Sequence, residues 1–134
     1  MEAVAKLVTK DAAPDSVSQH VPVPSRLTND RQYVVHALTT FDAIVHIQIV
    51  DDWGFPSWYP AVLFEIVDHS LPCDWICNVL DVGRVVLGPR FVAESRQAYE
   101  DMVELDADRV DLFWKRIDRL EAEEKARKED EQYL

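Results

Sequence analysis

Two runs of apolar, mostly β-branched residues lie in the first half of the chain. Residues 33–39 (YVVHALT) and 43–50 (AIVHIQIV) are separated by the short linker TFD. Because β-branched residues favour strands and short linkers favour tight turns, this pattern predicts a β-hairpin. Alternation places His46 and Gln48 on one face of the second strand, with Ile47 and Ile49 on the other. We expect the face with His46 and Gln48 to be the less buried.

Two further strands are predicted downstream. Residues 61–68 (AVLFEIVD) have strand composition, and residues 84–88 (RVVLG) form a short apolar run between Gly83 and Gly88-Pro89. Between them, Ser70 suits a helix N-cap and Pro72 a first helical turn, so we expect residues 71–78 to form a short helix or a tight turn. The periodicity of WICNVL does not distinguish helix from strand.

The last third of the chain has helical periodicity. Residues 95–104 predict one helix, and Asp106 is a good N-cap for a long helix that begins at Ala107. An apolar stripe at i, i+3, i+4 and i+7 spacing predicts a core-facing side of that helix; it comprises Val110, Phe113, Trp114, Ile117 and Leu120. Residues 121–134 are nearly all charged, which indicates an exposed helical tail.

Residues 1–30 have weaker signals. A short helix is expected from Glu2 to Val8, and the prolines of SQHVPVPSRL favour an extended path, so we expect a weakly structured N-terminal arm. The arm would be followed by a single domain over residues 31–120 and by the charged tail. Strands followed by helices predict an α+β fold, with an antiparallel sheet of about four strands and the C-terminal helix packed on one face.

Composition and charge limit the functions that fit. The chain of 134 residues has 48% hydrophobic residues, enough for one globular domain, and 25 acidic against 14 basic residues give a net charge of −11. This charge argues against binding to nucleic acid or to an anionic membrane. From Gln32 to Gly83 there is no Lys or Arg, while seven carboxylates occur there: Asp42, Asp51, Asp52, Glu65, Asp68, Asp74 and Asp81. These groups must face water or be paired by distant segments, and we expect a negative surface.

Motif searches identify no catalytic or cofactor site. There is no Gly-rich phosphate loop and no GxSxG, HExxH or CxxC motif, so we expect neither a cofactor nor a metal. Cys73 and Cys77 are expected to be free, mostly buried thiols. No apolar run reaches the ~18 residues needed to span a bilayer, and the first residues do not resemble a signal peptide. We therefore expect a cytoplasmic protein.

The stretch DDWGFPSWYP (51–60) is the first candidate binding site. Gly54, Pro56 and Pro60 argue against a helix or a central strand. The aromatic side chains could cover the open end of the sheet, or one or two could be exposed beside the aspartates as interface anchors. We expect a mixture of both, and the candidate partner-binding residues are Asp51, Asp52, Trp53, Phe55, Trp58 and Tyr59.

His36 and His46 are the second candidate. With a three-residue hairpin loop the two imidazoles would face each other, with Glu65 as a third group, and could form a metal site or an acid–base pair. With a two-residue loop the register shifts and the pair separates.

Two functions follow from these patterns. The first is a small acidic binding protein, most simply an immunity protein or inhibitor that neutralises a basic toxin enzyme through the 51–60 stretch. The alternative is a small enzyme or ligand-binding domain that uses His36 and His46 in a sheet-lined pocket. Homodimerisation through a sheet edge or the long helix is a further expectation.

Overall fold

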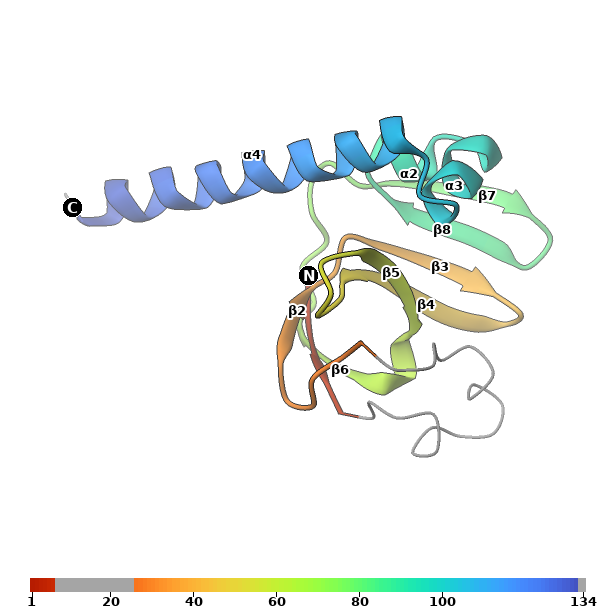
Figure 1. Cartoon of the computed structure of the whole chain (residues 1–134), viewed down its shortest axis with the longest axis horizontal. Coiled ribbons are helices and arrows are strands. Elements are labelled where there is room, and N and C mark those ends of the chain that lie inside the picture. The colour runs from red at the N-terminus through yellow and green to blue at the C-terminus, as the bar shows by residue number, and fades with distance from the viewer. Residues whose placement is uncertain (7–25, 133–134) are drawn as a thin grey trace.

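The computed structural model describes residues 1–6 and 26–132, and its layers are visible in Figure 1. The α+β class is confirmed: two antiparallel sheets combine with a long C-terminal helix. The first sheet has the order β2-β1-β6, and the second has the order β5-β4-β3-β8-β7. Among the described residues this gives eight strands, against about four predicted. Their bounds are β1 Glu2–Ala5, β2 Gln32–Val34, β3 Ala37–Phe41, β4 Ile44–Val50, β5 Pro56–Pro60, β6 Phe64–Asp68, β7 Ile76–Asp81 and β8 Arg84–Gly88.

The predicted hairpin is formed by β3 and β4. Its turn has only two residues, Asp42 and Ala43, and Phe41 pairs directly with Ile44. Both turn residues have positive φ, 50° and 60°, which is the backbone of a type I′ turn. Residues 32–34, which lie at the start of the predicted first strand, pair instead with β1 in the smaller sheet.

Residues 56–60 form a strand, β5. The prolines argued against a central strand at this place, and β5 is not a central strand. Pairing with β4 places β5 at the edge of the five-stranded sheet, and Pro56 and Pro60 are its first and last residues. An edge position tolerates proline because the missing N–H is not needed by a second neighbour. A single 3-10 turn, η2 (Ala61–Leu63), then leads into β6, so the strand predicted over residues 61–68 begins at Phe64 and belongs to the other sheet.

Residues 71–78 were expected to form a short helix or a tight turn; a turn is present at residues 73–74, and the helix alternative is wrong. Ile76–Asp81 forms β7, which pairs with β8 and so satisfies its backbone through the sheet. Ser70 is not a helix cap, because β7 and not a helix follows it; its backbone N–H donates to the Asp68 carboxylate. Cys73 and Cys77 are free, as expected, but both are exposed, because they lie in the turn and on the outer strand.

The helix expected from Glu2 to Val8 is also wrong over the residues that the structure describes. Glu2–Ala5 is the central strand of the three-stranded sheet, paired with β2 on one side and β6 on the other. Ala3 and Ala5 are fully buried in its core. The extended path predicted for SQHVPVPSRL lies outside the described residues, except for Arg26 and Leu27.

Two hydrophobic cores lie on opposite faces of the larger sheet. One core fills the space toward the smaller sheet and includes Ile47, Ile49 and Tyr59. The other lies under the helices and includes Val86, Met102 and Phe113. The expectation that the His46 and Gln48 face would be less buried is wrong, since Gln48 is fully buried and His46 is only 6% exposed.

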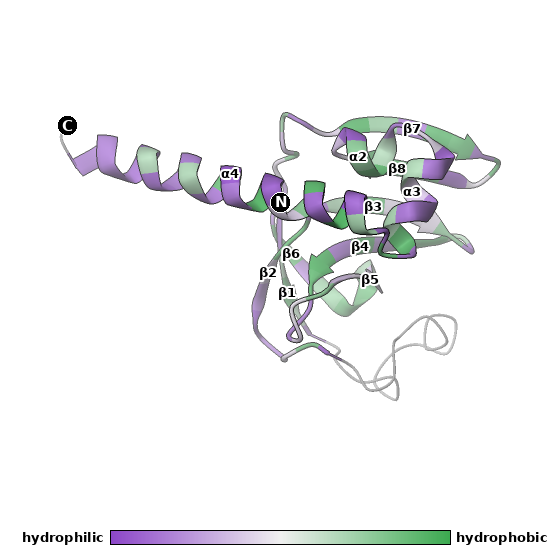
Figure 2. Ribbon diagram, turned by 45° about the horizontal axis from the view of Figure 1, so that its top comes forward, coloured by the Kyte–Doolittle hydropathy of each residue, from purple (hydrophilic) through white to green (hydrophobic). Residues whose placement is uncertain are grey.

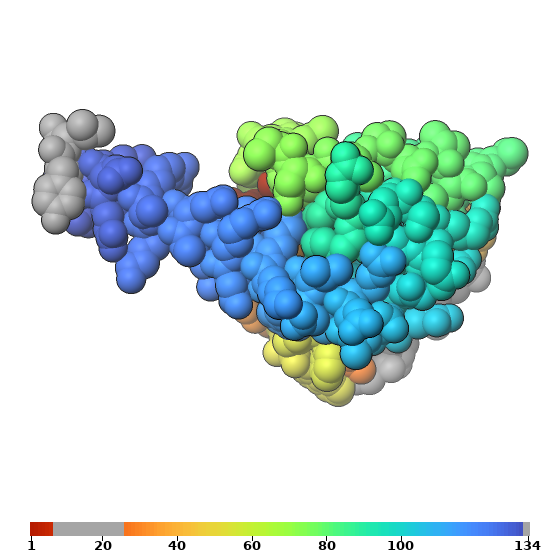
Figure 3. Space-filling view, turned by 90° about the horizontal axis from the view of Figure 1, so that it is seen from above, coloured from red at the N-terminus to blue at the C-terminus, as the bar shows by residue number. Residues whose placement is uncertain are grey.

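Three helices cover the second core; the starts of α3 and α4 agree with the prediction, whereas α2 was not predicted. α2 (Arg90–Ala93) is a single turn. α3 (Arg96–Val103) is capped by the Ser95 side chain, and α4 (Ala107–Gln132) follows Asp106. Within the apolar stripe of α4, Phe113 is buried and Trp114 is 36% exposed. Beyond Leu120 the described part of α4 is exposed and hydrophilic and extends past the body of the protein (Figures 2 and 3).

Candidate functional site

The two histidines do not share a site. In the two-residue register Thr39, not His36, lies opposite His46, so the alternative in which the pair separates is confirmed. The His36 ring packs against Phe113 at 4.9 Å and accepts a hydrogen bond from Arg116 at its Nδ1, 3.3 Å away. Burial first, and then the Arg116 charge, lower the His36 pKa to about 3. His36 is therefore a neutral core residue at physiological pH, and Glu65 is exposed on a strand of the other sheet.

Asp51 organises the loop between β4 and β5, which we call the aromatic loop (residues 51–55). One carboxylate oxygen accepts the backbone N–H groups of Trp53 and Phe55, both at 3.0 Å, and the other accepts the Ser57 hydroxyl at 2.8 Å. The Asp51 side chain is completely buried and lies 3.8 Å from the Arg26 guanidinium. Asp51 thus fixes the loop backbone and does not present charge to solvent.

Asp52 has a similar internal role on the other side of the loop. Its carboxylate accepts hydrogen bonds from Thr28 at 2.6 Å, Arg31 at 2.6 Å and Tyr33 at 2.7 Å. Burial raises the Asp52 pKa, but the hydrogen bonds from Thr28 and Tyr33 and the Arg31 charge outweigh that effect, so the pKa lies below its usual value. Asp52 therefore joins the loop to the segment before β2.

The remaining residues of the predicted site separate into three environments. Tyr59 is fully buried in the core between the sheets, with its hydroxyl accepting from the Arg26 backbone N–H. Trp58 points to the opposite face of β5 and meets Tyr99 edge to face, with the ring centroids 5.7 Å apart. Trp53 and Phe55 are exposed, at 59% and 47%. A mixture of buried and exposed rings was expected and is observed, but the fully buried ring is that of Tyr59, which we had not singled out.

Arg26, which the sequence did not indicate, completes the exposed face of the aromatic loop. Its guanidinium carbon lies 4.0 Å from the centroid of the Trp53 ring and 5.9 Å from that of Phe55. A cation over an aromatic face contributes about 0.5–1 kcal/mol at exposed sites. The loop thus presents two aromatic rings and a stacked guanidinium on a backbone that is already fixed.

The predicted negative surface of the central third is largely neutralised. Four of its seven carboxylates form ion pairs with arginines from outside the span: Asp51 with Arg26, Asp52 with Arg31, Asp74 with Arg116 and Arg119, and Asp81 with Arg96. Pairing by distant segments, one of the two alternatives that we considered, therefore applies to these four.

Unpaired acidic charge is found instead where α3 turns into α4. Four carboxylates there form no ion pair with any residue that the structure describes, and we call them the acidic corner: Glu100, Glu104, Asp106 and Asp108. Two apolar side chains at this corner are also exposed, Val103 at 48% and Leu105 at 42%. The nearby cation Arg109 is already paired with Glu94 and Asp101.

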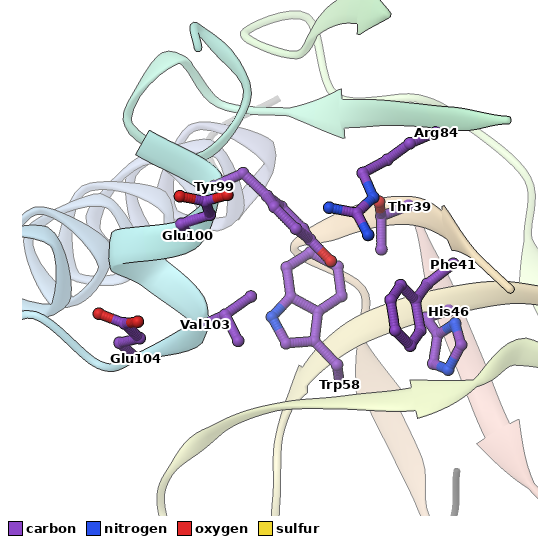
Figure 4. Close-up of a pocket in the computed structure, with 9 residues that line it drawn as sticks. All are labelled: Thr39, Phe41, His46, Trp58, Arg84, Tyr99, Glu100, Val103 and Glu104. Carbon is purple, nitrogen blue, oxygen red and sulfur yellow. The ribbon is translucent and has the colours of Figure 1, made fainter. Parts of the chain in front are cut away.

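A cleft of about 360 Å³ opens beside this corner, between the five-stranded sheet and α3 (Figure 4). We call it the aromatic cleft. It is lined by three aromatic rings, two carboxylates, Arg84, His46, Thr39 and Val103; the rings belong to Phe41, Trp58 and Tyr99, and the carboxylates to Glu100 and Glu104. The sheet residues come from the helix-facing side of β3, β4, β5 and β8, so cross-strand pairing brings them together.

Arg84 extends into the aromatic cleft from the start of β8 (Figure 4). Its guanidinium carbon lies 5.2 Å from the Phe41 ring centroid and 5.8 Å from that of Tyr99. One signal for Arg84 was present in the sequence, since it is the first basic residue after the cation-free span that ends at Gly83. Tyr99 lies within the helix predicted over residues 95–104, and nothing local indicated that it would form a wall of a cleft.

Two further structural findings bear on the kind of site. Across residues 1–6 and 26–132, no cluster of three or more His, Cys, Asp or Glu side chains has the arrangement needed to hold a metal ion. Nor does this part of the chain contain a helix with the length and apolar character required to cross a membrane.

Comparisons with protein-family models, with curated proteins and with solved structures gave no match.

Proposed function

We propose that this chain is a small binding protein that neutralises a partner enzyme, most simply as an immunity protein or inhibitor that covers a basic toxin enzyme. The observation that carries the proposal is the exposed face of the aromatic loop, with Trp53 and Phe55 beside the stacked Arg26. Trp and Arg are enriched among the residues that dominate binding energy at protein interfaces. A loop whose backbone is fixed by Asp51 before binding loses less conformational entropy on association.

Charge supports a basic partner. The net charge of −11 creates a negative field that accelerates the approach of a cationic protein, and such steering acts over the whole surface. In this arrangement the acidic corner and the exposed tail of α4 supply the field. Asp51 and Asp52 hold the loop in shape, so replacing them with lysine would disturb the loop itself.

The contact is tested with the double variant Trp53→Ala/Phe55→Ala. Each reading frame adjacent to its gene is co-expressed with the protein, growth is scored, and the dissociation rate of the pair formed with any toxic product is measured. Loss of two interface anchors is expected to weaken binding by about 2 kcal/mol or more, roughly 30-fold, and to abolish protection. The matched control is Val79→Ala/Val82→Ala. Val79 on β7 is 68% exposed, and Val82 in the turn after β7 is fully exposed. Equal protection by both double variants would exclude the aromatic loop as the contact.

Steering is tested separately with Glu104→Gln/Asp108→Asn, which removes two charges of the acidic corner without touching the loop. The association rate of the pair is expected to fall and to become less sensitive to salt, while the dissociation rate changes little. An association rate that is independent of ionic strength in the unmodified protein would contradict a basic partner.

A further inference from the structure

The aromatic cleft holds opposite charges that do not neutralise each other. The Arg84 guanidinium forms no ion pair and no hydrogen bond with any described residue, and its contacts are the faces of Phe41 and Tyr99. Glu100 and Glu104 on α3 are equally unpaired within that part of the chain. Figure 4 shows Arg84 on one side of the cleft and the two carboxylates on the other, with Tyr99 and Trp58 between them.

These walls select for the shape and charge of a ligand. Three aromatic rings around a volume of about 360 Å³ favour a flat ring system, which gains stacking and edge-to-face contacts. The carboxylates and the net charge of −11 disfavour an anion, while Arg84 disfavours a simple cation. An uncharged ring with hydrogen-bond acceptors on one edge and N–H donors on another can pair with Arg84 on one wall and with the two carboxylates on the other.

We infer that the aromatic cleft binds a guanine base carried by an uncharged nucleoside, a function separate from capture of a protein partner. Guanine presents O6 and N7 as acceptors on one edge, and a bidentate contact from Arg to these atoms is the commonest specific contact to this base. Its N1–H and amino groups, on another edge, are donors for carboxylates. Arg84 contacts the acceptor edge, Glu100 and Glu104 accept from the donor edge, and Tyr99 and Trp58 pack against the ring.

The site does not depend on the proposed protein-binding function. The aromatic loop follows the last residue of β4, whereas the cleft is built around His46 near the start of that strand and around α3. Guanosine binding is therefore expected to be lost with Arg84→Gln and the protein contact with Trp53→Ala/Phe55→Ala, whereas Glu104 belongs to both the acidic corner and the cleft and is not used to separate the two. A result at one site leaves the other proposal unaffected.

The experiment is a titration of the full chain with guanosine, followed through the indole N–H signals of its four tryptophans by ¹H–¹⁵N NMR. Trp58→Phe identifies the Trp58 signal. Guanosine at up to about 1 mM is expected to move that signal in a saturable way, with Trp53 and Trp114 unchanged. Adenosine lacks the O6 acceptor and the N1 donor, and guanosine monophosphate adds negative charge, so both should bind several-fold more weakly.

Arg84→Gln removes the charge and the bidentate donor, and it should weaken guanosine binding about tenfold or more. Arg84→Lys keeps the charge and tests the fork geometry, so it should also bind more weakly than the unmodified protein. The matched control is Arg90→Gln, an exposed arginine on α2 outside the cleft, which should bind normally. No shift at about 1 mM guanosine, equal binding of adenosine, or unchanged binding by Arg84→Gln would each overturn the inference.

Discussion

Arg116 binds Asp74 through two hydrogen bonds, Nε to Oδ2 at 2.6 Å and Nη2 to Oδ1 at 3.0 Å, although the residues are 42 positions apart. The arginine is on α4, and the aspartate is in the connection between β6 and β7. Arg119 adds a third bond to the same carboxylate, and Arg116 Nη1 also contacts His36. This network fixes the long helix to the sheet. It is centred on Arg116, the most buried cation of the described part of α4, whose side chain is 5% exposed.

Replacing Asp74 with alanine is expected to lower the free energy of unfolding by about 3 kcal/mol, because a buried guanidinium would lose its carboxylate. Urea denaturation measures the change. Asp111→Ala is the matched control on α4, since its ion pair with Lys115 is exposed and contributes less than about 1 kcal/mol. If the two variants lose the same stability, the Asp74 network is not what holds α4 in place.

Acid should destabilise the protein through His36. Its folded-state pKa is about 3, against 6.5 in the unfolded chain, so the unfolded state binds a proton first and the free energy of unfolding falls as the pH drops from 6.5 toward 3. The groups that lower this pKa beyond burial are Arg116 and the N-terminal amino group. Urea denaturation at several pH values between 7 and 4 is expected to show this slope, and His36→Asn should remove most of it. A slope that persists in the variant would assign the effect to other groups.

Gln48 is a buried polar side chain whose replacement should not harm the fold. It is completely inaccessible, and neither its amide nitrogen nor its amide oxygen has a hydrogen-bond partner among the residues that the structure describes. Burying such a group without partners costs about 1–3 kcal/mol, so Gln48→Met, which has similar length and no hydrogen-bonding amide, should raise the thermal midpoint or leave it unchanged. A fall of several degrees would show that the amide has a partner, such as a buried water.

The hairpin turn contains strain that a single substitution should relieve. Ala43 has a φ of 60°, a conformation that is unfavourable for residues with a Cβ by roughly 1 kcal/mol. Ala43→Gly should therefore stabilise the protein by up to about 1 kcal/mol in thermal or urea unfolding. The reverse substitution in the β7–β8 turn, Gly83→Ala, introduces a side chain at φ 78° and should destabilise it. Destabilisation by Ala43→Gly would show that the Ala43 methyl group contributes more than the strain costs.

Local signals predicted the elements that depend on local interactions. The Ser95 side chain accepts the Ala98 N–H at 3.0 Å, and Asp106 lies at the start of α4, as their spacing indicated. β1 and β7 were missed because their strand conformation is stabilised by partners far away in the chain. Nothing within Glu2–Ala5 indicates that β6 will pair with it. The periodicity of residues 75–80 fits helix and strand equally, and the pairing with β8 decides between them.

The candidate sites show the same difference between features that depend on local sequence and features that depend on distant partners. Trp53 and Phe55 could be named as candidates because an aromatic loop has a local signature; both are exposed, and their part in binding stays a prediction. The roles of Asp51 and Asp52 were misjudged because their partners Arg26 and Arg31 lie more than twenty residues away. The aromatic cleft combines β3, β4, β5, β8 and α3, so its wall chemistry follows from hairpin register and helix packing, and neither could be determined from one sequence.

From position 46 to position 49, every side chain of β4 is buried, with Ile47 and Ile49 in one interior and His46 and Gln48 on the opposite face. A strand shared in this way has no solvent-facing side at these positions, so it tolerates only replacements that fit the buried volume, as Gln48→Met is expected to do. Trp53 and Phe55, a few positions further on, support neither interior. Substitutions are therefore expected to be tolerated at the tip of the β4–β5 connection, where they would alter any partner contact made there, while few are tolerated in the strand that leads to it.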